Sequence, residues 1–127
     1  MERMRFVQGL LAALLVAPAW SLDPMAPPRF VSGGVGDEEL GALQAVRSQY
    51  NLQLLMTEKS GAYLSGVKVE VRDGKGQTLL DTTTTGPYLF AQLPDGRYQL
   101  VASLDGQTQQ RAVSVQGNKA RSVHLTW

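Results

Sequence analysis

The segment at residues 86–102, GPYLFAQLPDGRYQLVA, constrains the fold more than any other part of the chain. Pro94 fixes its backbone φ angle at roughly −65° and has no backbone N–H, and Gly96 tolerates a positive φ. The Leu-Pro-Asp-Gly-Arg run is therefore expected to reverse the chain. After the reversal, Tyr98, Leu100 and Ala102 recur at every second position, the period of a strand with one buried face. The segment therefore predicts an aromatic strand, a tight corner, and a second strand that runs back beside the first.

Alternation of apolar and polar residues recurs along the rest of the C-terminal half. In Val67, Val69 and Val71 the apolar side chains point one way, which is typical of a strand that is buried on one side and wet on the other. The Asp-Gly-Lys-Gly run at residues 73–76 then predicts a hairpin. Besides the two strands of the first segment, strands are expected at residues 51–56, 67–72, 78–85, 107–116 and 120–127. Short strands with frequent turns indicate a sandwich or small barrel, and we expect a mainly β fold, a seven-stranded antiparallel β-sandwich.

One helix is expected before the strands. Leu40, Leu43, Val46 and Tyr50 recur at steps of three and four residues within residues 36–51, which places them on one side of a helix. Acidic residues at the start of this segment suit a helix N-terminus, where backbone N–H groups are unpaired. Clustered carboxylates also suggest metal or acid–base chemistry, but a solvated helix start explains them better.

The N-terminal residues predict export. Residues 1–19 combine a charged start, an apolar run and the small residues of Ala-Pro-Ala, the pattern of a secretory signal peptide. The apolar run is shorter than the roughly 20 residues that a membrane-spanning helix needs. We expect cleavage after Ala19, with Ser21 as the alternative site, then a linker or extended arm at residues 20–35 and the domain at residues 36–127. The expected location is the periplasm.

Composition argues against several partners. Without Arg3, Arg5 and Glu2, ten basic and ten acidic residues remain of the 12 and 11 in the whole chain. A neutral surface without a basic run is a poor partner for nucleic acid. The chain has no cysteine, so neither a disulfide nor a lipid-attached thiol is available, and stability must come from packing. We expect a monomer with no membrane span after cleavage.

Two segments resemble a known family. Residues 61–80, GAYLSGVKVEVRDGKGQTLL, and residues 86–100, GPYLFAQLPDGRYQL, are similar to the carboxypeptidase regulatory-like domains, which are transthyretin-like or prealbumin-like sandwiches. The matching positions are turn formers and core residues: Leu64, Gly66, Val67, Gly86, Tyr88, Phe90, Leu93, Pro94, Gly96, Tyr98 and Leu100. The resemblance covers about residues 61–127 and implies the sandwich fold without implying an activity.

The residue types that carry catalysis or bind metals do not form a set. His124 is the only histidine, and its place opposite the apolar positions of the last strand predicts an exposed side chain. One histidine without cysteine does not supply a usual zinc site. The aspartates that calcium would use lie in separate turns and are better explained as turn formers or strand-edge charges: Asp73, Asp81, Asp95 and Asp105. The glycine-rich residues 33–36 lack the Lys-Ser/Thr of a phosphate-binding loop.

An enzymatic branch of the wider transthyretin-like fold, the hydroxyisourate hydrolases, carries several histidines and a Tyr-Arg-Gly-Ser ending. This chain ends in Val-His-Leu-Thr-Trp and departs from that pattern. The resemblance therefore carries no catalytic residue over, and we expect no catalytic, cofactor or metal site.

The favoured hypothesis is a non-catalytic module that binds a protein or carbohydrate partner through strand edges, loops or exposed aromatic residues. Tyr63, Tyr88 and Tyr50 are the candidate contact residues, although core packing explains Tyr88 and Tyr50 better. Neither the partner nor the binding residues follow from the sequence.

Two alternatives stay open. One is a small periplasmic hydrolase whose dispersed carboxylate site draws on Glu58, Asp81 or Asp95, although nothing in the spacing pairs them. The other is an outer-membrane-associated β protein, suggested by the terminal aromatic residue. The expected strands are shorter than the roughly 9–11 residues of a membrane-barrel strand, which argues against the second alternative.

Overall fold

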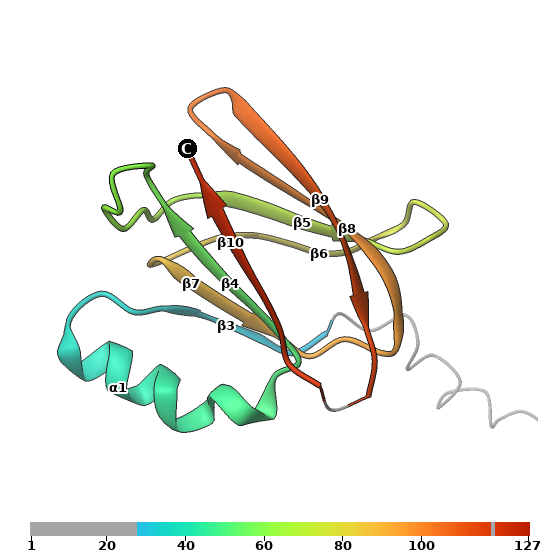
Figure 1. The fold of residues 1–127 in the computed structure, drawn as a ribbon, viewed down its shortest axis with the longest axis horizontal. Coiled ribbons are helices and arrows are strands. Elements are labelled where there is room, and N and C mark those ends of the chain that lie inside the picture. The colour runs from blue at the N-terminus through green and yellow to red at the C-terminus, as the bar shows by residue number, and fades with distance from the viewer. Residues whose placement is uncertain (1–27, 118) are drawn as a thin grey trace, which may run out of the picture.

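The described chain forms two four-stranded sheets with one helix outside them (Figure 1). The fold comes from a computed structural model that describes residues 28–117 and 119–127, so the expected signal peptide and residues 20–27 of the expected arm lie outside it. Sheet one has the strand order β10-β4-β7-β3 and sheet two the order β6-β5-β8-β9. The elements are β3 (Phe30–Gly33), α1 (Asp37–Val46), a 3-10 turn (Arg47–Gln49), β4 (Leu52–Thr57), β5 (Lys68–Arg72), β6 (Thr78–Thr83), β7 (Tyr88–Ala91), β8 (Gly96–Leu104), β9 (Gln107–Val115) and β10 (Arg121–Thr126).

The core lies between the facing sides of the two sheets. Every second residue of β4, β5 and β8 is buried there, as the alternation in the sequence predicts. The side chains from sheet one include Leu54, Met56 and Leu89, and those from sheet two include Val69 and Leu100. Because both inner faces are apolar, burial of this surface is the main force that holds the sandwich together.

The predicted hairpin at residues 73–76 is confirmed, and β8 and β9 form a second hairpin. In the β5–β6 turn, Asp73 Oδ1 accepts hydrogen bonds from the backbone N–H groups of Lys75 and Gln77, each at 2.9 Å. In the β8–β9 turn, Asp105 and Gly106 both have positive φ, 50° and 80°. Positive φ at both central residues is the geometry of a type I′ turn, whose twist matches that of paired strands.

The sandwich is confirmed, but the number of strands and one pairing differ from the prediction. The described residues hold eight strands, because Phe30–Gly33 at the end of the expected arm forms β3 and pairs with β7. Four residues that end in glycine are too few to show alternation. The sandwich is also not wholly antiparallel, since β10 pairs in parallel with β4. Strands of both sheets intervene between β4 and β10 in the chain, so no tight turn imposes opposite directions on them.

The Leu-Pro-Asp-Gly-Arg corner does not return the chain beside β7. It carries the chain from β7 in sheet one to β8 in sheet two. The side chain of Asn51, which is 3% exposed, holds the corner: its Oδ1 accepts from the Leu93 N–H at 2.9 Å, and its Nδ2 donates to the Leu93 carbonyl at 2.8 Å. The amide thereby replaces the strand partner that the Leu93 backbone lacks as it changes sheets.

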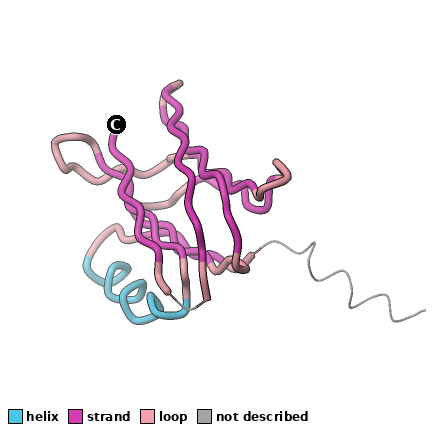
Figure 2. Tube along the Cα trace, turned by 45° about the vertical axis from the view of Figure 1, so that its right-hand side comes forward, coloured by secondary structure: helices cyan, strands magenta, loops and turns pink. Residues whose placement is uncertain are grey.

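Helix α1 covers the outer face of sheet one, the side away from sheet two (Figures 1 and 2). Leu43 is the buried residue of the helix, as its predicted apolar side requires. Beyond the helix, the Arg47 guanidinium lies 5.9 Å from the centre of the Phe90 ring and donates to Gln53 Oε1 at 2.7 Å. Phe90 is therefore 2% exposed although it points away from the main core. In the described residues, no helix is both long and apolar enough to cross a membrane.

Candidate functional site

The loop between β3 and α1 is closed by a carboxylate of the chain itself. Glu39 Oε1 accepts hydrogen bonds from the N–H groups of Gly34, at 2.8 Å, and Val35, at 3.0 Å. Gly36, with φ 84°, then begins the helix without a side-chain cap. The glycine-rich residues 33–36 thus turn the chain sharply, and two backbone donors of the turn, the N–H groups of Gly34 and Val35, are used by Glu39.

Two close approaches fix this loop on sheet one. A Cβ atom at Gly34 would lie 2.6 Å from Tyr88 Cδ2, and one at Gly86 would lie 2.3 Å from the carbonyl oxygen of Gly33. Both positions therefore need glycine for steric reasons. The Ser32 hydroxyl also donates to the Tyr88 carbonyl at 2.8 Å, which ties the end of β3 to β7.

A second loop, residues 58–66, brings an exposed tyrosine to the same end of the sandwich. Tyr63 forms an isolated antiparallel bridge with Thr57 at the end of β4. The Leu64 N–H donates to the Met56 carbonyl at 3.1 Å, and the Gly66 N–H donates to the Thr84 carbonyl at 2.9 Å. The loop is therefore anchored on both sheets, and it presents Tyr63 outward with 61% of its surface exposed.

An open groove of about 330 Å³ lies between these two loops. Val35, like Tyr63, is 61% exposed, which leaves two large apolar side chains in water on one groove. We call it the Tyr63 groove and define it by its lining residues: Gly34, Val35, Gly36, Asp37, Leu40, Tyr63, Leu64, Ser65 and Pro87. Its walls are mainly aliphatic and aromatic, the composition of most pockets that hold a ligand.

A row of four aromatic rings runs from the groove along the outer face of sheet one. The ring centres of Tyr63 and Tyr88 lie 6.3 Å apart, those of Tyr88 and Phe90 5.9 Å, and those of Phe90 and Tyr50 6.2 Å. These spacings are typical of favourable aromatic pairs. Burial raises the pKa of the Tyr88 hydroxyl above its ordinary value of 10.0, and the neighbouring Tyr63 adds to the shift. Tyr88 and Tyr50 are half-buried, whereas Tyr63 is open to solvent.

A second groove, of about 400 Å³, lies on the other side of the same loop, and Leu64 borders both. Trp127 forms part of its wall, and the Trp127 indole N–H donates to the Gln107 carbonyl at 3.2 Å. Its rim is more polar, with Glu58, Lys59 and Asp105. Loop 58–66 and the end of β10 lie at the same end of the sandwich (Figure 1). The two hollows adjoin at this loop.

Residues 53–127, more than half of the chain, match the carboxypeptidase regulatory-like domain family. The chain belongs to this family. Carboxypeptidase regulatory-like domains are β-sandwich modules and are generally non-catalytic. No curated protein matches the sequence. The Tyr63 groove straddles the edge of the matched region: Val35, Asp37 and Leu40 precede it, whereas Tyr63 and Pro87 lie within it.

His124 is the candidate catalytic base of this carboxypeptidase regulatory-like domain, and it has no acidic hydrogen-bond partner among the described residues. His124 is exposed on β10, as its position in the strand predicts, and its Nε2 lies 2.7 Å from Oγ1 of the buried Thr57. No carboxylate within the described residues hydrogen-bonds to this histidine. The pair therefore lacks the third group that orients the base in a hydrolytic triad.

The carboxylates that a dispersed hydrolytic site would use lie on separate elements. Glu58 is in the exposed loop, where it accepts from the Ser60 hydroxyl at 3.3 Å. Asp81 lies on β6, and Asp95 Oδ1 accepts from the Gly117 N–H at 2.6 Å, so Asp95 fastens one turn to another. Across residues 28–117 and 119–127, no three His, Cys, Asp or Glu side chains gather closely enough to hold a metal ion.

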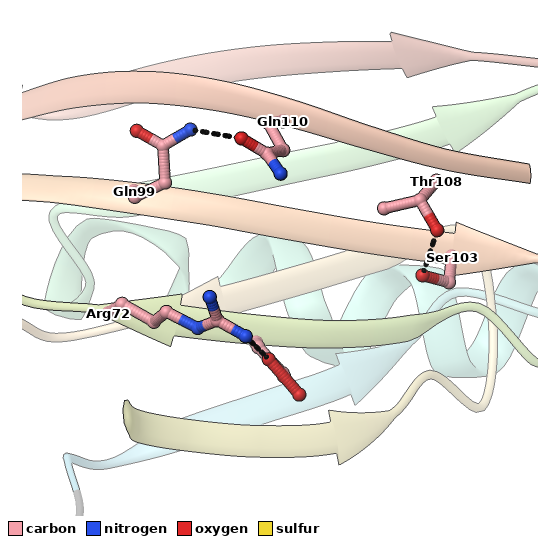
Figure 3. Close-up of polar contacts among 6 residues, drawn as sticks. Arg72, Gln99, Ser103, Thr108 and Gln110 are labelled. Carbon is pink, nitrogen blue, oxygen red and sulfur yellow. Dashed lines mark hydrogen bonds and ion pairs between the residues drawn. The ribbon is translucent and has the colours of Figure 1, made fainter. Parts of the chain in front are cut away.

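The outer face of sheet two of the carboxypeptidase regulatory-like domain carries polar side chains that pair with one another (Figure 3). Gln99 pairs with Gln110 at 3.2 Å, and Ser103 with Thr108 at 2.9 Å, each across β8 and β9. The Arg72 guanidinium binds Glu70 on the same strand at 2.7 Å. The first two pairs join neighbouring strands, whereas the ion pair lies within β5. Among the described residues, no large apolar side chain is exposed on this face, so it is a solvated polar surface.

Proposed function

We propose that this chain is an exported, non-catalytic β-sandwich module that acts in the periplasm by binding a protein or glycan partner. The observation that carries the proposal is the Tyr63 groove, where Tyr63 and Val35, both 61% exposed, border one apolar hollow. Single exposed apolar residues are common on monomers, and two that border one concave surface support a role in binding.

The chemistry of the described residues supports binding over catalysis. His124, Glu58, Asp81 and Asp95 stand on different elements, and the structure pairs none of these carboxylates with the histidine. The pattern of residues 1–19 supports export. N-terminal sequencing of the protein recovered from a periplasmic fraction tests that part: we expect it to start at Trp20 or Leu22, and an intact Met1 would contradict it.

Site-specific photo-crosslinking in cells tests the binding site. A photoreactive phenylalanine derivative replaces Tyr63, and the matched control carries it at Phe30, the other large exposed aromatic residue, which is 41% exposed on β3. We expect covalent adducts, with protein or with glycan, at position 63 and not at position 30. No adduct at position 63, or equal adducts at both positions, would contradict the proposed site.

A further inference from the structure

The Tyr63 groove carries one charged group and no opposite charge. Asp37 is the only ionisable acid or base among its lining residues apart from the neutral phenol of Tyr63. Within the described residues, Asp37 forms neither an ion pair nor a side-chain hydrogen bond, and it is exposed. An unpaired carboxylate on an apolar groove favours a ligand that combines a cation with apolar surface.

The same loop disfavours an anionic ligand. Glu39 Oε1 already accepts from the N–H groups of Gly34 and Val35, two backbone donors of this loop. An incoming phosphate or carboxylate would have to displace Glu39 and would meet the charge of Asp37. The groove therefore selects against negative charge, although it lies beside a helix start that would otherwise attract it.

The row of aromatic rings shows which cation fits. Towards its inner end the row already carries guanidinium groups of the chain itself: Arg47 lies 5.9 Å from the Phe90 ring centre, and Arg29 lies 5.4 Å from that of Tyr50. The outermost ring, Tyr63, carries no such group in the part of the chain that the structure describes, and it is the most exposed ring of the row. Planar guanidinium groups stack on aromatic rings and form paired hydrogen bonds with carboxylates, which the compact ammonium group of lysine does less well.

We propose that the Tyr63 groove binds an arginine side chain of a partner protein, together with an aliphatic residue next to that arginine. The guanidinium stacks on Tyr63 and pairs with Asp37, while the aliphatic neighbour packs against Val35 and Leu64. This inference rests on the proposed binding function and names the chemistry of its partner. A protein segment fits better than a glycan because the lining offers few hydrogen-bonding side chains besides Asp37, Tyr63 and Ser65.

A titration with short peptides tests the inference directly. The probe is the blocked peptide acetyl-Val-Arg-Leu-amide, added to the ¹⁵N-labelled full chain and followed through the backbone amide signals of Val35, Tyr63 and Ser65. The matched probe replaces arginine with citrulline, which has nearly the same shape but no charge. We expect the arginine peptide to shift these signals and to bind about tenfold more tightly than the citrulline peptide, the amount that a cation–π contact and one charged hydrogen bond supply together.

Two variants assign the preference to the proposed contacts. Asp37→Asn removes the charge, and Tyr63→Leu removes the ring while it keeps an apolar side chain. Each should reduce the affinity for the arginine peptide to about that for the citrulline peptide. The matched controls Asp81→Asn, an exposed carboxylate on β6, and Phe30→Leu, an exposed aromatic residue on β3, should leave the affinity unchanged. All four side chains are exposed, so we expect only small changes in the thermal melts, and a cooperative melt for each variant would exclude loss of folding as the cause.

The outcomes separate this inference from the proposed function. Equal binding of both peptides at the groove would overturn the arginine preference and leave the groove a binding site. No shift of these signals at an arginine-peptide concentration of about 10 mM, the limit of very weak binding, would also overturn the inference. A glycan adduct in the photo-crosslinking experiment without any peptide shift would replace the protein partner with a glycan. Absence of adducts at position 63 would remove the proposed function itself.

Discussion

Replacement of Asn51 should destabilise the domain more than any other single polar substitution in the core. Its amide makes two hydrogen bonds to the backbone of Leu93, at 2.8 and 2.9 Å, where the chain changes sheets. Asn51→Ala leaves both the N–H and the carbonyl of Leu93 unpaired, and Leu93 is 2% exposed. Each orphaned buried group costs about 1–3 kcal/mol, so we expect a loss of about 4 kcal/mol. That is a large share of the roughly 5–15 kcal/mol by which domains are stable.

Urea unfolding followed by far-ultraviolet circular dichroism measures this loss. The matched control is Gln99→Ala, which removes an exposed amide pair with Gln110 and should cost under about 0.5 kcal/mol. Equal slopes of free energy against urea would show that wild type and variants expose similar surface on unfolding. A loss below about 1 kcal/mol for Asn51→Ala would refute the role of the amide as the partner of the corner.

Asn51→Asp sharpens the test because it replaces only the donor. Its ionised carboxylate would face the Leu93 carbonyl inside the protein, so the pKa of the new side chain should rise on folding. Because the pKa is higher in the folded state than in the unfolded state, the loss of folding stability is small below the unfolded-state pKa of about 3.9. It grows as the pH rises above that value. The difference in stability between wild type and this variant should therefore widen between about pH 4 and 7, whereas the Asn51→Ala difference should stay constant. Parallel pH profiles would contradict the proposed hydrogen bonds.

Three further predictions test the packing. The Tyr98 hydroxyl donates to the Pro94 carbonyl at 2.6 Å, so Tyr98→Phe should cost about 0.5–1.5 kcal/mol in urea unfolding, and Tyr98→Ala about 3–5 kcal/mol. Burial, and after it the nearby carboxylates, raise the pKa of the Tyr98 hydroxyl above 10.0. The stability that this hydroxyl contributes is therefore complete below that pH and is lost as the pH rises through the pKa of the folded state. The Tyr98→Phe variant should show no such loss. Gly86→Ala places a Cβ 2.3 Å from the last carbonyl oxygen of β3 and should cost about 1–3 kcal/mol, whereas Gly74→Ala, with open space around it, should be nearly neutral. Phe90→Ala should cost about 3–5 kcal/mol and increase amide hydrogen exchange in α1 more than in β5; equal exchange in both elements would show that the ring does not dock the helix.

Local patterns predicted the elements well, and pairing over long distances poorly. The β5–β6 hairpin follows from the valine alternation and Asp73, both of which act within a few residues. The path from β7 to β8 could not be predicted in this way, because Pro94 and Gly96 allow the chain either to return within one sheet or to cross to the other sheet. The deciding contact comes from Asn51, more than forty residues away in the chain. The parallel partner of β10 is equally remote, since alternation fixes which face of a strand is buried but not its neighbour.

The candidate site was only partly visible in the sequence. Tyr63 was among the three tyrosines proposed as contacts, and it is the exposed one, while Tyr88 and Tyr50 are half-buried as their interpretation as packing residues suggests. The groove itself was missed because it draws on three distant segments, around Val35, Tyr63 and Pro87. The adjacent glycines before α1 were the available signal, since they permit the close approach that forms one wall.

The parallel pairing of β4 with β10 also determines when the domain can complete its folding. β4 is strongly apolar, and its partner on one side is supplied by the most C-terminal strand of the described chain. Until those residues emerge during synthesis, the edge of β4 stays open to other polypeptides, a recognised route to aggregation. Because β4 gains this partner late, we expect chaperones to bind the nascent chain. We also expect proteolytic fragments that lack β10 to aggregate.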